Sequence, residues 1–164
     1  MGLLHSFVLA ASRGPARPPS IPPDVTLPAI SGGVAVRVRP RILFVDDEPM
    51  ILKSLAATLR KHFEVISGGS GQAALDILAR DPGLRVVVSD YRMPGMDGGV
   101  FLAQVRERFP EIVRILLSGA GAAGGIAANP ELVFRFLPKP CPRQTLIDTI
   151  EEALALSSGA PTRN

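Results

Sequence analysis

Residues 41–49 read Arg-Ile-Leu-Phe-Val-Asp-Asp-Glu-Pro, and this stretch decides the fold. Four consecutive bulky apolar residues at 42–45 are typical of a strand that is buried on both faces, as in a parallel sheet. The run ends on three acidic residues, Asp46, Asp47 and Glu48, and Pro49 suits the first position of a helix. We therefore expect a buried strand that brings carboxylates to its carboxyl end.

The same alternation of strand and helix continues along the chain. The predicted strands cover 42–45, 63–66, 84–89, 112–117 and 133–137, and the predicted helices cover 49–61, 71–80, 100–109, 120–129 and 144–156. The helix over 120–129 should be short or irregular because this stretch is rich in glycine, which disfavours helix. Five strand–helix units predict an α/β fold with a doubly wound, five-stranded parallel sheet.

Short polar residues mark the starts of two predicted helices. Ser70 is expected to be the N-cap of the second helix, and Asp97 precedes the apolar run of the third. We expect Asp97 to cap that helix rather than to bind a metal ion. Gly98 and Pro49 are interpreted as residues that matter for the backbone conformation at the helix starts rather than for the chemistry.

The chain is expected to have three parts. Residues 1–40 contain six prolines between Pro15 and Pro28 and predict a disordered tail, although the Pro-Pro pairs also resemble ligands of SH3-type domains. Residues 41–156 form the folded domain, and residues 157–164 are expected to be a frayed tail. Only eight residues follow the last predicted helix, so no output domain is expected after it.

Charge and cysteine content limit the functions to consider. Residues 1–39 carry four arginines and one aspartate, whereas the rest of the chain carries fourteen basic and fourteen acidic residues. The folded part is therefore neutral overall, and we expect no nucleic-acid binding. The apolar stretch 3–11 is too short to cross a bilayer and lacks a preceding basic residue, so neither a membrane span nor a signal peptide is expected. A single cysteine, Cys141, suits a cytoplasmic protein and has no neighbouring base that would make it reactive.

The residues with the most chemistry lie where the predicted strands end. Asp46 and Asp47 follow the first strand, Asp90 the third, Ser118 the fourth and Lys139 the fifth. These ends meet at one edge of a parallel sheet. Carboxylates crowded together repel unless a cation neutralises them, and Mg²⁺ prefers such oxygen ligands. An aspartate there can attack a phosphoryl donor, with a lysine and a hydroxyl to hold the phosphoryl oxygens.

Four separated segments occur in the order seen in a known family: Asp46-Asp47, Asp90 to Gly98, Ser118 to Ala120, and Lys139-Pro140. Together they resemble the receiver domains of two-component response regulators, and the resemblance covers residues 41–156. It implies a flavodoxin-like (βα)5 fold with strand order 2-1-3-4-5. The segments around Asp90 and residues 134–140 are also similar to receivers that precede cyclic-di-nucleotide phosphodiesterase domains.

The resemblance implies a role for each residue at the strand ends. Asp90 would be phosphorylated by a histidine kinase or a histidine phosphotransfer protein. Mg²⁺ would be held by Asp47, Asp90 and the backbone carbonyl of Arg92, and by Asp46 through water. Ser118 and Lys139 would contact the phosphoryl oxygens, and the peptide bond before Pro140 would be cis.

The family also has a switch in which the Ser118 hydroxyl moves toward the phosphoryl group and an aromatic ring turns inward. Phe136 lies three residues before Lys139 and matches that aromatic position, although it could equally be a core residue. The resemblance implies a phosphoacceptor rather than an enzyme, one that can take phosphoryl groups from small donors and lose them by its own hydrolysis. Because no output domain is expected, we expect a stand-alone receiver, with a truncated relative of the receivers that precede phosphodiesterase domains as the alternative. It would signal through a protein effector, or through a homodimer formed by the fourth helix, fifth strand and fifth helix.

Two other functions fit parts of the pattern. A pseudo-receiver would be an interaction module without phosphoryl turnover, but the complete set of acidic, hydroxyl and lysine residues argues against it. A phosphatase with an aspartate nucleophile would need a second acid two residues further on. That position holds Arg92, which cannot act as an acid.

Overall fold

The computed structural model describes residues 39–119 and 131–158, and the structural statements below concern these residues. By contacts the chain divides into Met1–Val34 and Ala35–Asn164, and every described residue belongs to the second unit. The predicted proline-rich tail up to residue 38, the predicted fourth helix over 120–129 and residues 159–164 lie outside the described residues.

Strands and helices alternate in the order that the sequence predicts. The described elements are β1 (Arg41–Val45), α1 (Pro49–Leu59), β2 (Glu64–Gly68), α2 (Gly71–Arg80), β3 (Val86–Asp90), α3 (Gly98–Arg108), β4 (Val113–Ser118), β5 (Arg135–Pro138) and α5 (Arg143–Ser158). The five strands form one all-parallel sheet in the order β2-β1-β3-β4-β5. The predicted doubly wound, flavodoxin-like fold and its strand order are therefore confirmed.

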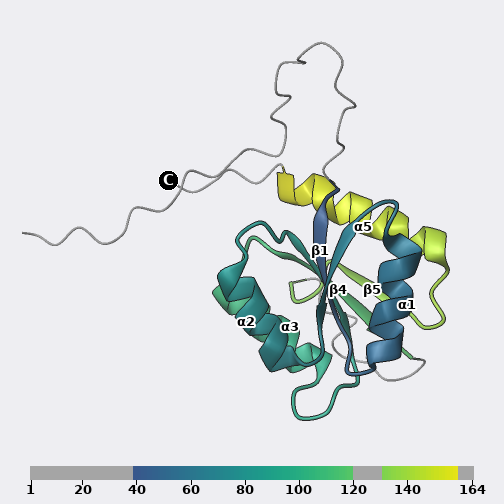
Figure 1. Ribbon diagram of the computed structural model, residues 1–164. Coiled ribbons are helices and arrows are strands. Elements are labelled where there is room, and N and C mark those ends of the chain that lie inside the picture. The colour runs from purple at the N-terminus through teal and green to yellow at the C-terminus, as the bar shows by residue number, and fades with distance from the viewer. Residues whose placement is uncertain (1–38, 120–130, 159–164) are drawn as a thin grey trace, which may run out of the picture. The chain divides into compact units, whose positions relative to one another are not determined.

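Helices cover both faces of the sheet. Figure 1 shows α1 and α5 on one side and α2 and α3 on the other. Alternate residues of each central strand enter opposite cores: Leu43 and Val45 pack with α2 and α3, whereas Ile42 and Phe44 pack with α1 and α5. This is why the strand sequences are continuously apolar instead of alternating with polar residues.

The predicted first residue of α1 and the two predicted N-caps are confirmed, whereas α3 begins at Gly98, two residues before the predicted start at 100. Pro49 is at the first position of α1, and the Ser70 hydroxyl accepts a hydrogen bond from the Ala73 amide at 3.2 Å. The Asp97 carboxylate accepts one from the Val100 amide at 2.9 Å, as expected of an N-cap. No helix among the described residues is long and apolar enough to span a membrane.

The last strand begins two residues later than predicted, at Arg135 rather than at residue 133. The Arg114 guanidinium donates to the carbonyl groups of Glu131 and Leu132, at 3.2 and 2.8 Å, in the segment just before the strand. The Phe134 amide makes the first bond to β4, at 2.8 Å to the Arg114 carbonyl. The Arg114 side chain thus bonds to backbone carbonyl groups just before the point where strand pairing was predicted to begin.

The last helix continues through Ser158, two residues beyond the predicted end at 156. The hydroxyls of Ser157 and Ser158 both donate to the Leu154 carbonyl, at 2.8 and 2.9 Å. Such bonds satisfy a carbonyl that a helix end otherwise leaves without a partner. The expectation of a frayed tail from residue 157 is therefore wrong for these two residues.

Candidate functional site

Asp90 is the last residue of the central strand β3, and its side chain is only 12% exposed. Both carboxylate oxygens have partners. Oδ1 lies 2.8 Å from Nζ of Lys139, and Oδ2 accepts a hydrogen bond from the Arg92 amide at 3.1 Å. The carboxylate is therefore held at the sheet edge by a cation and by the backbone of the loop that follows it.

Asp46 lies beside Asp90 because β1 and β3 are neighbours in the sheet. It is 3% exposed, and its backbone amide extends the pairing with β2 by donating to the Gly68 carbonyl at 3.1 Å. Its Oδ1 accepts from the Glu48 amide at 2.9 Å, and its Oδ2 lies 3.4 Å from Nζ of Lys139. A carboxylate this deeply buried needs such partners to remain charged.

Lys139 reaches both carboxylates from the end of β5. Its amide donates to the Ser118 carbonyl at 2.7 Å, and the Lys139–Pro140 peptide bond is cis. Burial alone would lower the pKa of Lys139, but hydrogen bonds and charge attraction to Asp90 and Asp46 outweigh it, and the pKa is raised above its ordinary value. The lysine is therefore a firmly charged ammonium placed between two acids.

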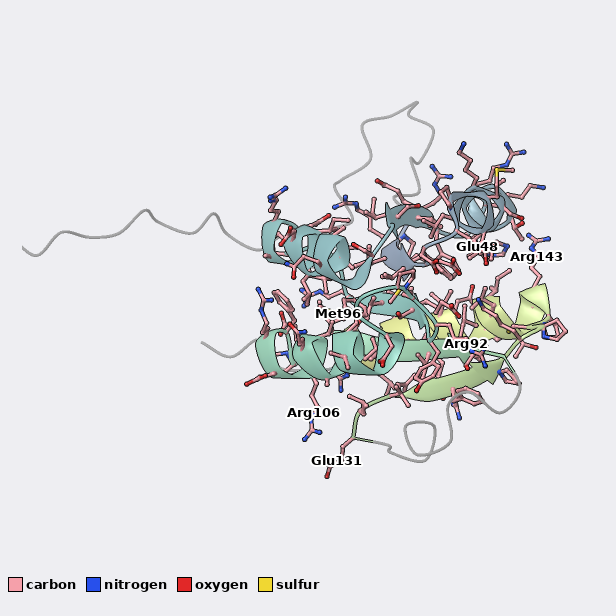
Figure 2. All side chains as sticks on the ribbon, turned by 90° about the horizontal axis from the view of Figure 1, so that it is seen from below. Glu48, Arg92, Met96, Arg106, Glu131 and Arg143 are labelled. Carbon is pink, nitrogen blue, oxygen red and sulfur yellow. The ribbon has the colours of Figure 1, made fainter. Side chains whose placement is uncertain are left out.

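Asp47 and Arg92 lie at the mouth of the site and are both exposed. They line an open depression of about 470 Å³ together with Tyr91, Met93, Pro94 and Asp97. Figure 2 shows Arg92 toward the same side of the molecule as Glu48, the N-cap of α1, and Arg143, the first residue of α5. The depression exposes the carboxylates of Asp47 and Asp97 to solvent at this edge of the sheet.

The two predicted switch residues are less directly connected to Asp90. Ser118 ends β4 and is fully buried, and its hydroxyl donates to the Gly119 carbonyl at 3.2 Å. Phe136 is half-buried and packs against the core on the α2 and α3 side. The structure thus brings the Asp46 and Asp90 carboxylates together around the Lys139 ammonium, whereas the Ser118 hydroxyl bonds to the Gly119 carbonyl instead.

The donor set at this edge consists of oxygen atoms. Within residues 39–119 and 131–158, no three His, Cys, Asp or Glu side chains are gathered so that they alone could hold a metal ion. The expected ligand set needs no such trio, because it combines two carboxylates, Asp47 and Asp90, with the Arg92 carbonyl. Mg²⁺ favours oxygen ligands and keeps several waters, so these residues fit that ion.

Gly98 lies directly against the backbone of Asp90, a contact that the sequence did not indicate. A Cβ at this position would lie 2.1 Å from the Asp90 carbonyl oxygen, and the Gly98 amide donates to the Tyr91 carbonyl at 2.8 Å. The loop after Asp90 can return to α3 only because residue 98 has no side chain.

Cys141 is near Lys139 in the chain but takes no part in this chemistry. Burial raises the pKa of its thiol, which keeps it protonated. Its sulfur contacts the Pro142 carbonyl at 3.6 Å. The geometry agrees with the expectation of an unreactive cysteine.

Comparison with known proteins agrees with this geometry. The sequence profile of the response regulator receiver domain matches residues 42–151. The hydrogenase transcriptional regulatory protein HoxA of Cupriavidus necator is 40% identical over 115 residues, which are 69% of this chain and 24% of HoxA. The chain belongs to the response regulator receiver domain family.

Solved structures give the same result. A response regulator receiver domain protein from Clostridium thermocellum is 30% identical with a TM-score of 0.66, covering 71% of this chain and 94% of that one. The signal receiver domain of an HD domain-containing protein from Pseudomonas fluorescens Pf-5 is 31% identical with a TM-score of 0.69, covering 75% of this chain and all of that one. The chain thus matches whole receiver domains but spans only about a quarter of the length of HoxA.

Receiver domains generally are phosphoacceptors rather than enzymes, and they bind Mg²⁺ in an acidic pocket. They interact with histidine kinases and with downstream effectors.

Proposed function

We propose that Asp90 accepts a phosphoryl group from the phosphohistidine of a histidine kinase or a histidine phosphotransfer protein. The observation that carries this proposal is the placement of the Lys139 ammonium, 2.8 Å from Asp90 and 3.4 Å from Asp46. The lysine offsets one of the two negative charges of the acid pair and would lie close to the oxygens of an incoming phosphoryl group.

In the proposed step, a carboxylate oxygen of Asp90 attacks the phosphorus atom. A bond between that oxygen and phosphorus forms, and the bond between phosphorus and the donor's imidazole nitrogen breaks. The imidazole leaves with the bonding electron pair, and the product is an aspartyl phosphate. Lys139 contacts the phosphoryl oxygens in this proposal, and no general base is needed because a carboxylate oxygen, unlike a hydroxyl, attacks without giving up a proton.

Mg²⁺ is part of the proposal, with Asp47, Asp90 and the Arg92 carbonyl as direct ligands and Asp46 as a ligand through water. When bound, the ion neutralises charge on the phosphoryl oxygens. The donation of the Arg92 amide to Asp90 Oδ2 supports this assignment, because it fixes the backbone of residue 92 against the carboxylate.

A protein donor is supported by the surface beside Lys139. A hollow of about 240 Å³ opens between α1 and α5, lined on its apolar walls by Ile51, Leu55 and Leu146 and bordered by Lys139 and Cys141. Met50, in the first turn of α1, is 73% exposed. Apolar surface so close to a charged site is what a protein partner, rather than a small phosphate ester, would cover.

Signalling in this proposal uses Ser118 and Phe136. The Ser118 hydroxyl would leave the Gly119 carbonyl and bind the phosphoryl group, and the half-buried Phe136 would turn further inward. A cytoplasmic protein effector, or a second copy of the chain, would then bind the altered surface around β5 and α5.

Intact mass measurement tests the proposal. The protein is incubated with Mg²⁺ and acetyl phosphate and should gain the mass of one phosphoryl group, and Asp90→Asn should gain none. A folded protein that binds Mg²⁺ without any gain would instead be a pseudo-receiver. Rapid hydrolysis of the donor by wild type, without a trapped phosphoryl group, would indicate a phosphatase.

A further inference from the structure

Met93 and Met96, both in the loop between β3 and α3, pack on the core between the sheet and the helices α2 and α3, and Met96 makes the more specific contacts. Figure 2 shows Met96 between α2 and α3. The Gln104 side chain of α3 donates to its sulfur at 3.6 Å, and the residue packs against the core on that face. The turn that presents it contains Gly95, with φ of +79°, and a bond from the Met96 amide to the Pro94 carbonyl at 2.9 Å.

On α2, the Met96 side chain occupies the space that a side chain at position 71 would need. A Cβ added to Gly71 would lie 2.7 Å from the Met96 sulfur, 3.1 Å from its Cγ and 3.3 Å from its Cβ. At 2.7 Å one of the groups must shift, and because the Met96 sulfur is near the end of a flexible side chain while its Cγ and Cβ are also within 3.4 Å, the Met96 side chain is the group that shifts. Met96 and the first residue of α2 are therefore in direct steric contact.

The backbone gives no other reason for glycine at this position. The φ of Gly71 lies outside the left-handed region, and Ser70 before it already caps the helix. Alanine in a helix is favoured over glycine by about 1 kcal/mol, so Gly71 costs some helix stability. What the absence of a side chain provides here is room for Met96.

We infer that Met96 is a positioning residue that couples the first turn of α2 to the metal-binding loop. This inference rests on the proposed function of the Asp90 site. The loop carries Arg92, whose amide donates to Asp90 and whose carbonyl is the proposed Mg²⁺ ligand. At the end of this loop, the Gly98 amide donates to the Tyr91 carbonyl, which closes the loop into a short ring. A displacement of Met96 is therefore transmitted to the backbone around Arg92.

The test is a double-mutant cycle of wild type, Gly71→Ala, Met96→Ala and the double variant. Mg²⁺ binding is followed by tyrosine fluorescence, because Tyr91 is the only tyrosine, the chain has no tryptophan, and Tyr91 lines the depression with Asp47 and Arg92. Gly71→Ala should weaken Mg²⁺ binding about tenfold, as loss of support behind a metal ligand does. In the double variant the alanine at 71 should add no further loss to that of Met96→Ala, because its Cβ then meets no side chain.

A second measurement needs no metal. Hydrogen exchange at the Arg92 and Gly98 amides should speed up in Gly71→Ala and show the same non-additivity in the cycle. Gly69→Ala is the matched control, since a Cβ there has no neighbour within 4 Å, and it should change neither measurement.

The inference is overturned if Gly71→Ala has equal effects in the presence and absence of Met96, or if it leaves both measurements unchanged. If wild type binds no Mg²⁺, the proposed function fails, and the hydrogen-exchange cycle still decides whether Met96 couples α2 to the loop.

Discussion

The Nζ atom of Lys139 lies 2.8 Å from Oδ1 of Asp90 and 3.4 Å from Oδ2 of Asp46. These contacts join the end of the edge strand β5 to the ends of β3 and β1, across residues that are 49 and 93 positions apart in the chain. The ammonium therefore attracts both carboxylates and holds three strand ends together.

The raised pKa of Lys139 predicts how this stabilisation depends on pH. Its charged form is favoured in the folded state, so its contribution to stability is complete below the unfolded lysine pKa of about 10.4 and is lost as the pH rises through the higher folded value. Denaturant unfolding of wild type and Lys139→Met should show a stability difference that is constant from pH 7 to pH 9 and shrinks at higher pH. A difference that grows in alkali would contradict the sign of the shift.

The role proposed for Arg92 belongs to its backbone carbonyl and amide, so it can be tested separately from the exposed side chain. Arg92→Ala keeps both the amide that donates to Asp90 and the carbonyl, so its Mg²⁺ affinity should stay close to that of wild type. Asp47→Ala removes a carboxylate and should lower the affinity by about tenfold or more. Calorimetric Mg²⁺ titration measures both affinities. An equally large loss in the two variants would show that Mg²⁺ binding depends on the Arg92 side chain and not only on its backbone.

Gly98 should tolerate no side chain. Gly98→Ala places a Cβ 2.1 Å from the Asp90 carbonyl, and such overpacking against backbone should lower the free energy of unfolding by about 3 kcal/mol. Urea unfolding tests this, with Gly69→Ala as a control that should stay within about 0.5 kcal/mol of wild type because its surroundings are open. Equal stabilities of the two variants would show that the loop can move away at no cost.

Arg114 should contribute to stability through backbone carbonyls rather than through an ion pair. Burial, and to a smaller extent Arg106, lowers its pKa, and its guanidinium bonds to the carbonyls of Ile112 and Leu132 at 2.8 Å each. Arg114→Met leaves these groups without that donor and should lower the free energy of unfolding by about 2 kcal/mol.

The matched control for Arg114 is Arg106→Met. Figure 2 shows Arg106 next to Glu131, and the two form an exposed pair at 3.1 Å. Its removal should cost at most about 1 kcal/mol. A larger loss in Arg106→Met than in Arg114→Met would reverse this assignment.

The sequence predicted most of what depends on periodicity and on the meeting of parallel strand ends. The buried strands, the caps at Ser70 and Asp97, and the proximity of Asp46, Asp90 and Lys139 all follow from local patterns and one topological rule. Features that depend on loop conformation could not be predicted. The contact of Met96 with Gly71 and that of Gly98 with the Asp90 carbonyl join residues whose spacing in the chain carries no periodic signal.

Strand and helix ends were the least predictable part of the fold. In the sequence, Arg114 is one charged residue within an apolar strand. Its identity alone does not indicate that its side chain bonds to the carbonyl groups that precede β5. The hydroxyls of Ser157 and Ser158 extend α5, although serine is more often found beyond a helix than inside it. In both cases a side chain bonds to backbone carbonyls, an arrangement that the order of residue types does not reveal.

The central claim is that Asp90 itself carries the phosphoryl group. After incubation with acetyl phosphate and Mg²⁺, borohydride reduction converts an aspartyl phosphate to homoserine, and peptide mass spectrometry then locates the converted residue. The account predicts homoserine at position 90 and intact aspartates at 46, 47 and 97. Conversion at any of those three positions, or no conversion anywhere in a folded protein that binds Mg²⁺, would contradict it.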